Sequence, residues 1–127
     1  MGLFDKLFGS DTPSEKKALP WQKLSTLGQL NDIADASHER PQVIFKHSTR
    51  CGISRSVINR FEHDYDLDDS VDLYYLDLLS FRDISNEIAS RFQVWHESPQ
   101  LLVIKDGHVV HHASHGGIQS ESIKTHL

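Results

Sequence analysis

Strand-forming residues gather in four segments of this 127-residue chain. Residues 42–47 begin as an apolar, β-branched run and end in polar residues, and residues 71–79 are largely apolar on both faces, as a central strand covered by helices is. Residues 101–105 and 108–112 are joined by Asp106-Gly107, a strong two-residue turn, and therefore predict a hairpin.

The segments between these strands have apolar residues spaced by three or four positions, which is the period of a helix. Thr26, with Gln29 three residues later, is a capping box and predicts a helix that ends near Ser37. A second helix follows the first strand, and a third has its start signal within 80–83. Residues 120–127 are expected to close the chain as a short helix.

This order predicts an α/β fold with a central mixed sheet flanked by helices, preceded by an N-terminal extension. Strands separated by helices form right-handed parallel crossovers, and the hairpin adds antiparallel strands to the same sheet. We expect one folded domain over 21–127. Residues 1–20 are interpreted as a short amphipathic helix over 1–8 and a linker rich in Gly, Ser and Pro over 9–20.

Composition narrows the possible functions. The formal charge of −5 and the pI near 5.9 argue against a nucleic-acid binder, because no basic excess is present to neutralise phosphates. No apolar run is long enough to span a membrane, and no secretory signal is recognisable at the N-terminus. A single cysteine fits a reducing cytoplasm, where an unpaired thiol stays reduced.

Cys51, that single cysteine, lies where the first strand gives way to a helix. At a helix N-terminus, unpaired N–H groups and the positive end of the dipole favour the thiolate, which is the reactive form. Lys46, His47 and Arg50 would add positive charge, and the hydroxyl of Ser54 could bond to the sulfur or to the first helical turn. From position alone, a small buried apolar cysteine is an equally good interpretation.

Nine histidines are present, and four of them are close together near the C-terminus: His108, His111, His112 and His115. On a strand, His108 and His112 share one face and His111 points to the other, so three ligands do not converge. A closed zinc site needs four convergent ligands. We therefore expect no metal site.

Two features resemble the thioredoxin fold. The first is a cysteine at the first strand-to-helix junction. The second is the segment 94–107, which is similar to the thioredoxin segment that carries a cis-proline just before a strand and its turn. The resemblance assigns that role to Pro99, which would shape the site beside the sulfur.

A closer resemblance is to the YtxJ family of monothiol bacilliredoxins, and it runs from about Trp21 to the end of the chain. It rests on several separate motifs: residues 45–51 with Ser54, 75–77, 85–89, 96–100 and 113–115. Gly52 departs from the proline that is usual after the cysteine in that family, which loosens the loop.

The resemblance implies a thiol–disulfide oxidoreductase whose Cys51 takes bacillithiol, or a similar low-molecular-weight thiol, from bacillithiolated proteins. A free small thiol or another redoxin would regenerate it, and no tightly bound cofactor is implied. Arg50 would also pair with a carboxylate of the small thiol. Cys51 would be supported by Lys46, His47, Thr49, Arg50 and Ser54. The substrate would meet His96, Ser98, Pro99, Gln100 and His115, with an extended pairing along the backbone of Ser98 and Pro99.

Two alternatives remain open at this point. Residues 51–54 also resemble the Cys-Gly-Phe-Ser loop of monothiol glutaredoxins, which carry an iron–sulfur cluster between two chains, and Gly116-Gly117 falls where those proteins have a glycine pair. Ser98-Pro99-Gln100 lacks the Thr-Val-Pro of glutaredoxins and argues against this interpretation. The second alternative is a redox-inactive module that uses the same groove to bind extended peptides.

Overall fold

The computed structural model of the chain describes residues 19–127. These residues form one sheet of five strands in the order β1-β3-β2-β4-β5, together with α-helices and short 3-10 helices. The elements are β1 (Gln22–Lys23), α1 (Gly28–Ala36), β2 (Gln42–His47), α2 (Gly52–Asp64), β3 (Asp72–Asp77), α3 (Arg82–Phe92), β4 (Gln100–Lys105), β5 (His108–Ser114), η2 (His115–Gly117) and η3 (Ser120–His126).

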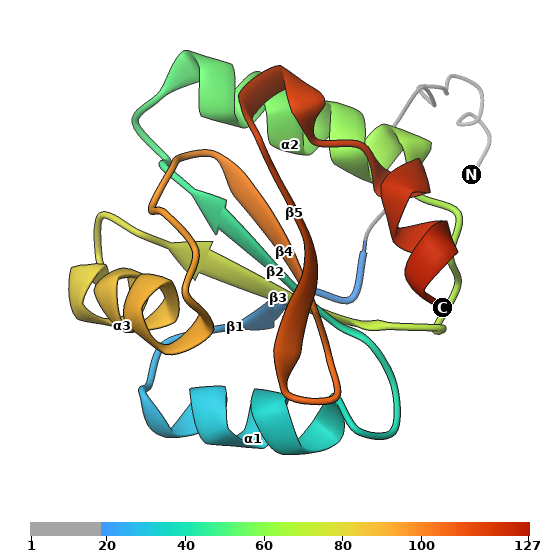
Figure 1. Cartoon of the computed structure of the whole chain (residues 1–127). Helices are drawn as coiled ribbons and strands as arrows, with labels where there is room; N and C mark the ends of the chain where they lie inside the picture. Colours follow the sequence, from blue (N-terminus) through green and yellow to red (C-terminus); the bar gives the residue numbers. More distant parts are fainter. Residues whose placement is uncertain (1–18) are drawn as a thin grey trace, which may run out of the picture.

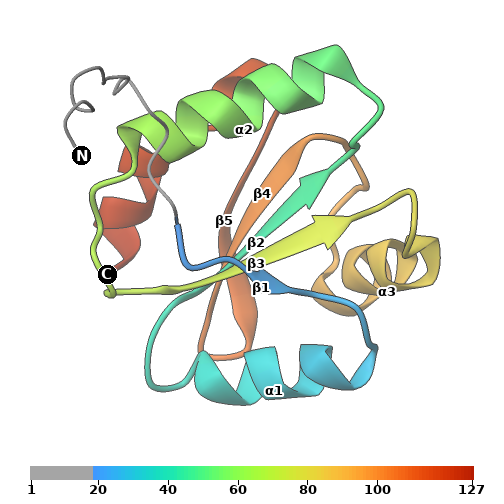
Figure 2. The ribbon, with the colours of Figure 1, turned by 180° about the vertical axis from the view of Figure 1, so that it is seen from behind.

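The sheet is mixed and lies between two layers of helices, as predicted. Strands β1, β3 and β2 run parallel, and β4 and β5 add antiparallel pairs on the other side of β2. Helix α2 and the closing η3 cover one face of the sheet, whereas α1 and α3 cover the other (Figure 1). The view from behind shows the same two layers (Figure 2).

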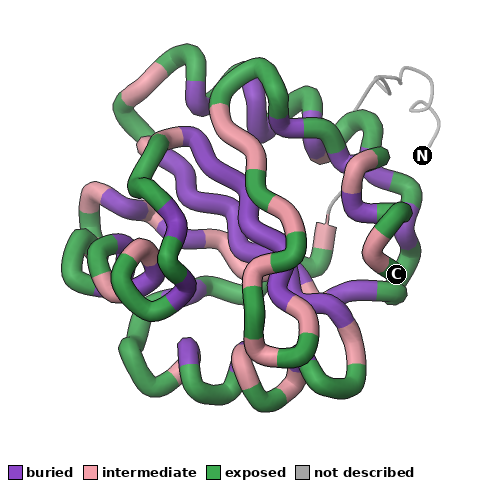
Figure 3. The backbone as a smooth tube through the Cα atoms, in the orientation of Figure 1, coloured by how far each residue is buried: buried purple, intermediate pink, exposed green. Residues whose placement is uncertain are grey.

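Strand β2 lies at the centre of this arrangement, and all six of its residues are buried. Successive side chains of a strand point to opposite faces, so β2 contributes to two separate cores. Val43 and Phe45 pack with residues of α2, and Ile44 packs with residues of α1 and α3. Burial is continuous along β2 and along most of β4, and it falls off towards the outer turns (Figure 3).

The start of α1 and the hairpin turn form as predicted, and they are connected through the end of α1. Gln29 N donates to Thr26 Oγ1 at 3.3 Å and Thr26 N donates to Gln29 Oε1 at 3.0 Å, the two bonds of a capping box. At the other end of the helix, the carbonyl and hydroxyl of Ser37 accept hydrogen bonds from Asp106 N and Gly107 N. The turn residues both have positive φ, as a tight hairpin requires.

Two features differ from the expectations, and a third expected feature lies outside the described residues. The short strand β1 was not predicted, because its two exposed residues carry no apolar pattern; it forms by pairing parallel to β3. The closing helix forms as the 3-10 helix η3. The expected N-terminal helix over 1–8 and most of the linker lie outside the described residues. Within residues 19–127, no helix is long and apolar enough to cross a membrane.

Phe45 offers a test of the α2-side core. Its ring is fully buried and lies 6.0 Å from that of Trp21 and 5.4 Å from that of Phe61, both in edge contact. We expect Phe45→Ala to lower the free energy of unfolding by about 3–5 kcal/mol, because the small side chain leaves a cavity. Urea denaturation measures this. The control Val110→Ala, at a position 41% exposed, should change it by less than about 0.5 kcal/mol; equal losses would contradict the assignment.

Candidate active site

Cys51 is the N-cap residue of α2, with extended backbone angles of φ −104° and ψ 122°. Its N–H donates to Ser48 O at 3.2 Å, and its carbonyl accepts the first helical hydrogen bond, from Arg55 N at 3.0 Å. The side chain is partly exposed. The sulfur therefore belongs to a residue at a helix N-terminus, where the sequence placed it, and another molecule can reach it.

Ser54 supports the loop before Cys51 rather than the sulfur. Its side chain is fully buried, and Oγ accepts a hydrogen bond from Ser48 N at 3.1 Å. A second hydrogen bond joins Oγ to His47 Nδ1 at 2.7 Å. Both partners precede Cys51, so Ser54 connects α2 back to the end of β2. The expected bond to the sulfur or to the first helical turn is replaced by these two.

His47 does not supply the positive charge that was expected beside the sulfur. Its ring is buried and lies 5.5 Å from that of Tyr75. Burial is the largest influence and lowers the pKa of His47; Asp77 opposes this, whereas Arg55 adds to it. At neutral pH the imidazole is therefore neutral, and its role is to hydrogen-bond Ser54.

Lys46 is also placed differently from the expectation. Because its neighbours on β2 alternate between faces, its side chain is directed towards α3, away from the face that carries α2. Lys46 is 0% exposed, and Nζ donates to Ser85 O at 3.4 Å and to His96 Nδ1 at 3.2 Å. Burial lowers the pKa of Lys46 to about 8. The ammonium group therefore bonds on the α3 side of the sheet, whereas the sequence suggested a place beside the sulfur.

The peptide bond between Ser98 and Pro99 is cis, as the resemblance implied. The Pro99 carbonyl accepts a hydrogen bond from His115 N at 3.0 Å, which joins this loop to the end of β5. Ser98 Oγ is buried without a hydrogen-bond partner in the described part of the chain. His115 itself is exposed, and its Nδ1 lies 3.5 Å from Glu97 Oε1.

The cysteine loop and the proline loop meet at one edge of the sheet. Lys46, the penultimate residue of β2, pairs with Gln100, the first residue of antiparallel β4. The residues that follow Lys46 therefore run alongside those that precede Gln100. This is the carboxyl-terminal edge of the parallel strands, where open α/β sheets place their sites.

The remaining predicted site residues divide into exposed and buried ones. Arg50 and Thr49 are exposed, and Thr49 O accepts a hydrogen bond from Arg55 Nη1 at 3.1 Å. Gln100 is almost fully buried, and its Nε2 donates to Trp95 O at 2.9 Å. Gln100 thus supports the proline loop from beneath instead of facing a substrate.

Two residues at this edge carried no signal of their role in the sequence. Ser85 is buried on α3, and its hydroxyl lies 3.1 Å from His96 Nδ1. Trp95 is 90% exposed, whereas Trp21 is partly buried and packs against the core. Trp95 forms one wall of a groove of about 560 Å³ beside α3, lined also by Asn86, Ala89, Ser90, Gln93, Val94 and His96.

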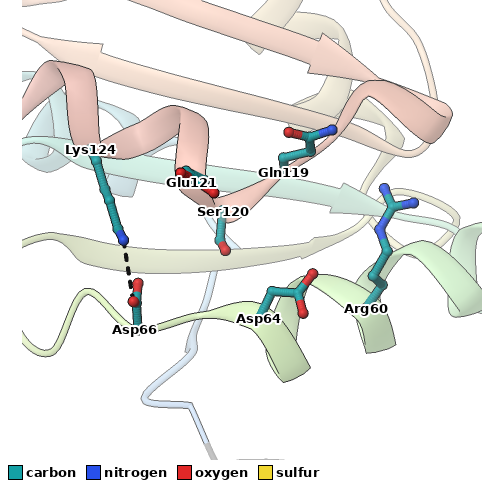
Figure 4. A pocket seen from close by; sticks show the side chains of 7 residues that line it. All are labelled: Arg60, Asp64, Asp66, Gln119, Ser120, Glu121 and Lys124. Carbon is teal, nitrogen blue, oxygen red and sulfur yellow. Dashed lines mark hydrogen bonds and ion pairs between the residues drawn. The ribbon is translucent and has the colours of Figure 1, made fainter.

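A separate polar pocket lies at the other end of α2 (Figure 4). Its volume is about 390 Å³, and it is lined by Arg60, Asp64, Asp66, Gln119, Ser120, Glu121 and Lys124. Arg60 Nη2 donates to Gly116 O and Ile118 O, and Lys124 pairs with Asp66 at 3.2 Å. These bonds fasten the C-terminal segment to α2 and to the loop that follows it. Across residues 19–127, no group of three or more His, Cys, Asp or Glu side chains is arranged to hold a metal ion.

Comparison with known proteins gives a family and a fold. The family model described as Monothiol bacilliredoxin BrxC matches residues 22–123. One solved structure, provisionally described as an oxidoreductase with a thioredoxin fold, is 30% identical over 83% of this chain and 91% of its own, with a TM-score of 0.70.

Two thioredoxins show the same fold at lower identity. Fasciola hepatica thioredoxin is 20% identical over 82% of this chain and 94% of its own, with a TM-score of 0.63. Malassezia sympodialis thioredoxin is 18% identical, with coverages of 88% and 90% and a TM-score of 0.62. The predicted thioredoxin-like fold is thereby confirmed.

Lys46 makes the stability of the fold depend on pH. Its pKa is about 8 in the folded protein, against 10.5 for a free lysine side chain. Between these values the unfolded chain binds the proton more tightly, so raising the pH favours the folded state. From about pH 8 to about pH 9.5, wild type should gain about 2 kcal/mol of unfolding free energy relative to Lys46→Met.

Urea denaturation at several pH values measures this difference. The control is Lys105→Met, which removes a partly buried lysine at the opposite end of β4. That variant should follow wild type between about pH 8 and about pH 9.5. Parallel curves for wild type and Lys46→Met would contradict a buried, proton-releasing amine.

Proposed function

The chain belongs to the monothiol bacilliredoxin BrxC family, and we propose that it uses Cys51 to remove a low-molecular-weight thiol of the bacillithiol type from protein mixed disulfides. Family membership and the thioredoxin fold make it a thiol–disulfide oxidoreductase. One observation carries the finer proposal: the single cysteine of the chain is partly exposed at the N-terminus of α2, at the sheet edge that also carries the cis-proline loop.

In the first step, the Cys51 thiolate attacks the small-thiol sulfur of the mixed disulfide. A new S–S bond forms between Cys51 and the small thiol, and the S–S bond to the protein substrate breaks. The electron pair of that bond leaves on the substrate cysteine, which takes a proton from water. One disulfide is exchanged for another, so no external oxidant or reductant is needed.

In the second step, a free small thiol or another redoxin attacks the adduct on Cys51 and releases it. A free small thiol would give a symmetrical small-molecule disulfide and the Cys51 thiolate. This chain has no second cysteine to do the same work internally. Ser54 stands three residues after Cys51, where a Cys-x-x-Cys motif has its second thiol, and its hydroxyl is already bonded to His47 and Ser48.

The substrate protein would bind as an extended strand along the loop before β4. In residues 19–127, Ser98 forms no backbone hydrogen bond, whereas the Pro99 carbonyl is already paired with His115. We expect the N–H and C=O of Ser98 to pair with the substrate backbone. His115 pairs with Glu97 at the same loop and would border the bound strand.

Arg50 would take the small thiol. It precedes Cys51 directly and is exposed, so its guanidinium can pair with a carboxylate of the thiol while the sulfur reacts. No tightly bound cofactor enters this reaction. We place it in a reducing cytoplasm, since a lone thiol that must return to the reduced form is suited to that compartment.

The test is the intact mass of the reduced protein after incubation with a model protein that carries a bacillithiol mixed disulfide. We expect the protein to gain the mass of the small thiol while the model protein is freed, because one disulfide is exchanged for the other. Cys51→Ser should gain no mass, and its transfer rate should fall to that measured without enzyme.

Val110→Ala serves as the control variant and should transfer as wild type does. The same incubation with a glutathione mixed disulfide identifies the preferred thiol. Transfer of glutathione alone would keep the chemistry but contradict the bacillithiol assignment. Absence of transfer from either disulfide, with Cys51 still alkylated by iodoacetamide, would contradict the proposed function.

A further inference from the structure

A polar cluster of two buried side chains and one exposed histidine lies on the sheet face opposite to α2, and the reaction at the sulfur does not use it. It consists of Lys46 from β2, Ser85 from α3 and His96 from the loop between α3 and β4. Nζ of Lys46 and Oγ of Ser85 lie 3.2 Å and 3.1 Å from the same atom, Nδ1 of His96. The cluster therefore joins the centre of the sheet to the loop that ends in Pro99.

This buried lysine has no ion-pair partner in the described part of the chain. No carboxylate of residues 19–127 forms an ion pair with Nζ, which bonds only to a carbonyl and to the imidazole. A buried charge of this kind costs stability, and an apolar side chain of similar volume fits such sites better. Stability alone therefore does not account for Lys46.

The bonds of the cluster also determine the protonation of His96. A lysine ammonium can only donate, so Nδ1 of the imidazole must accept, and the ring proton lies on Nε2. The surroundings agree with a neutral ring: burial lowers the pKa of His96, with further contributions from Lys46 and Arg82 and opposition from Glu97. His96 is exposed, so Nε2, on the other side of the ring, is directed away from the cluster.

A second buried side chain reinforces the same attachment. Gln100 is the cross-strand partner of Lys46, and its Nε2 donates to Trp95 O at 2.9 Å. Two adjacent strands thus bond to two consecutive loop residues: Lys46 of β2 to His96, and Gln100 of β4 to Trp95. Three residues later, Pro99 is held from the side by His115.

We propose that Lys46 is a positioning residue for thiol transfer. Through its bond to His96, it holds the segment 96–99 in the position in which an extended substrate can pair with that segment and reach the sulfur of Cys51. This proposal rests on the proposed function, in which that segment binds the substrate. Lys46 lies on the face opposite to α2, so its removal should disturb substrate alignment and leave the intrinsic reactivity of Cys51 unchanged.

Steady-state kinetics of Lys46→Met test this separation. With a protein mixed disulfide as substrate, we expect KM to rise about tenfold and kcat to change less than about twofold, because a displaced loop loses substrate binding. The rate of Cys51 alkylation by iodoacetamide should equal that of wild type. Lys105→Met is the matched control and should behave as wild type in both assays.

His96→Gln and the double variant identify the route. If Lys46 acts through His96, the two single variants and the double variant raise KM by similar factors, because all three break one contact. Factors that multiply in the double variant would overturn the proposal. So would an unchanged KM in Lys46→Met, or equal losses in kcat/KM and in alkylation. If Lys46→Met does not fold, His96→Gln still tests the proposal, because it changes an exposed side chain. An unchanged KM in His96→Gln would then overturn the proposal.

A spectroscopic measurement separates this proposal from the proposed function, since it needs no substrate. Long-range proton–nitrogen spectra of wild type should show His96 with its proton on Nε2, and Lys46→Met should gain the Nδ1-protonated form. A wild-type His96 protonated on Nδ1, or identical spectra in the variant, would overturn the positioning role. If wild-type protein transfers no small thiol, the proposed function is contradicted, but the spectroscopic result on Lys46 and His96 remains valid.

Discussion

The burial of β2 on both faces is the constraint on which the rest of the structure depends. A strand at the centre of a sheet has no solvent side, so each polar residue on it must find its partners within the layer that its side chain enters. At the end of β2, Lys46 enters the layer of α3, and His47 enters the layer of α2. One strand thereby supports the cysteine loop from one face and the proline loop from the other.

The electrostatics of the site follow from this division. Of the basic residues before Cys51, Lys46 lies on the other face and His47 is buried and neutral at neutral pH, which leaves the exposed Arg50 and the N-terminus of α2 beside the sulfur. Positive potential at the sulfur therefore comes from the backbone N–H groups at the start of α2 and from exposed arginine side chains, Arg50 and Arg55. Counting the basic residues that precede Cys51 in the sequence therefore overestimates the positive charge near its sulfur.

Much of the fold was readable because the signals are local. The capping box at Thr26, the turn at Asp106-Gly107 and the strand-to-helix change at Cys51 depend on a few adjacent residues, and all three form as expected. The strand β1 depends instead on pairing with β3, whose paired residues lie 52 positions further along the chain, and has no pattern of its own. Long-range pairing of two exposed residues leaves no mark in a sequence.

The supports of the site were harder to predict for a similar reason. Gln100 and Ser85 are buried because other elements cover them, and a polar residue at a strand or helix start gives no sign of that. Lys46 is a different case. The alternation of side chains along a strand places it opposite to His47, so its direction was available from the sequence once the strand was assigned. What no pattern gave was its partner, His96.

The serine at position 54 has a consequence for how the protein responds to its surroundings. A dithiol protein that closes its own disulfide consumes or releases two small thiols per cycle, so its balance depends on the square of their concentration. With one thiol, an adduct at Cys51 exchanges one small molecule for another, and equal numbers stand on both sides of the equilibrium. The occupied fraction then follows the ratio of oxidised to reduced thiol alone. A cell that dilutes or concentrates its whole thiol pool leaves that fraction unchanged.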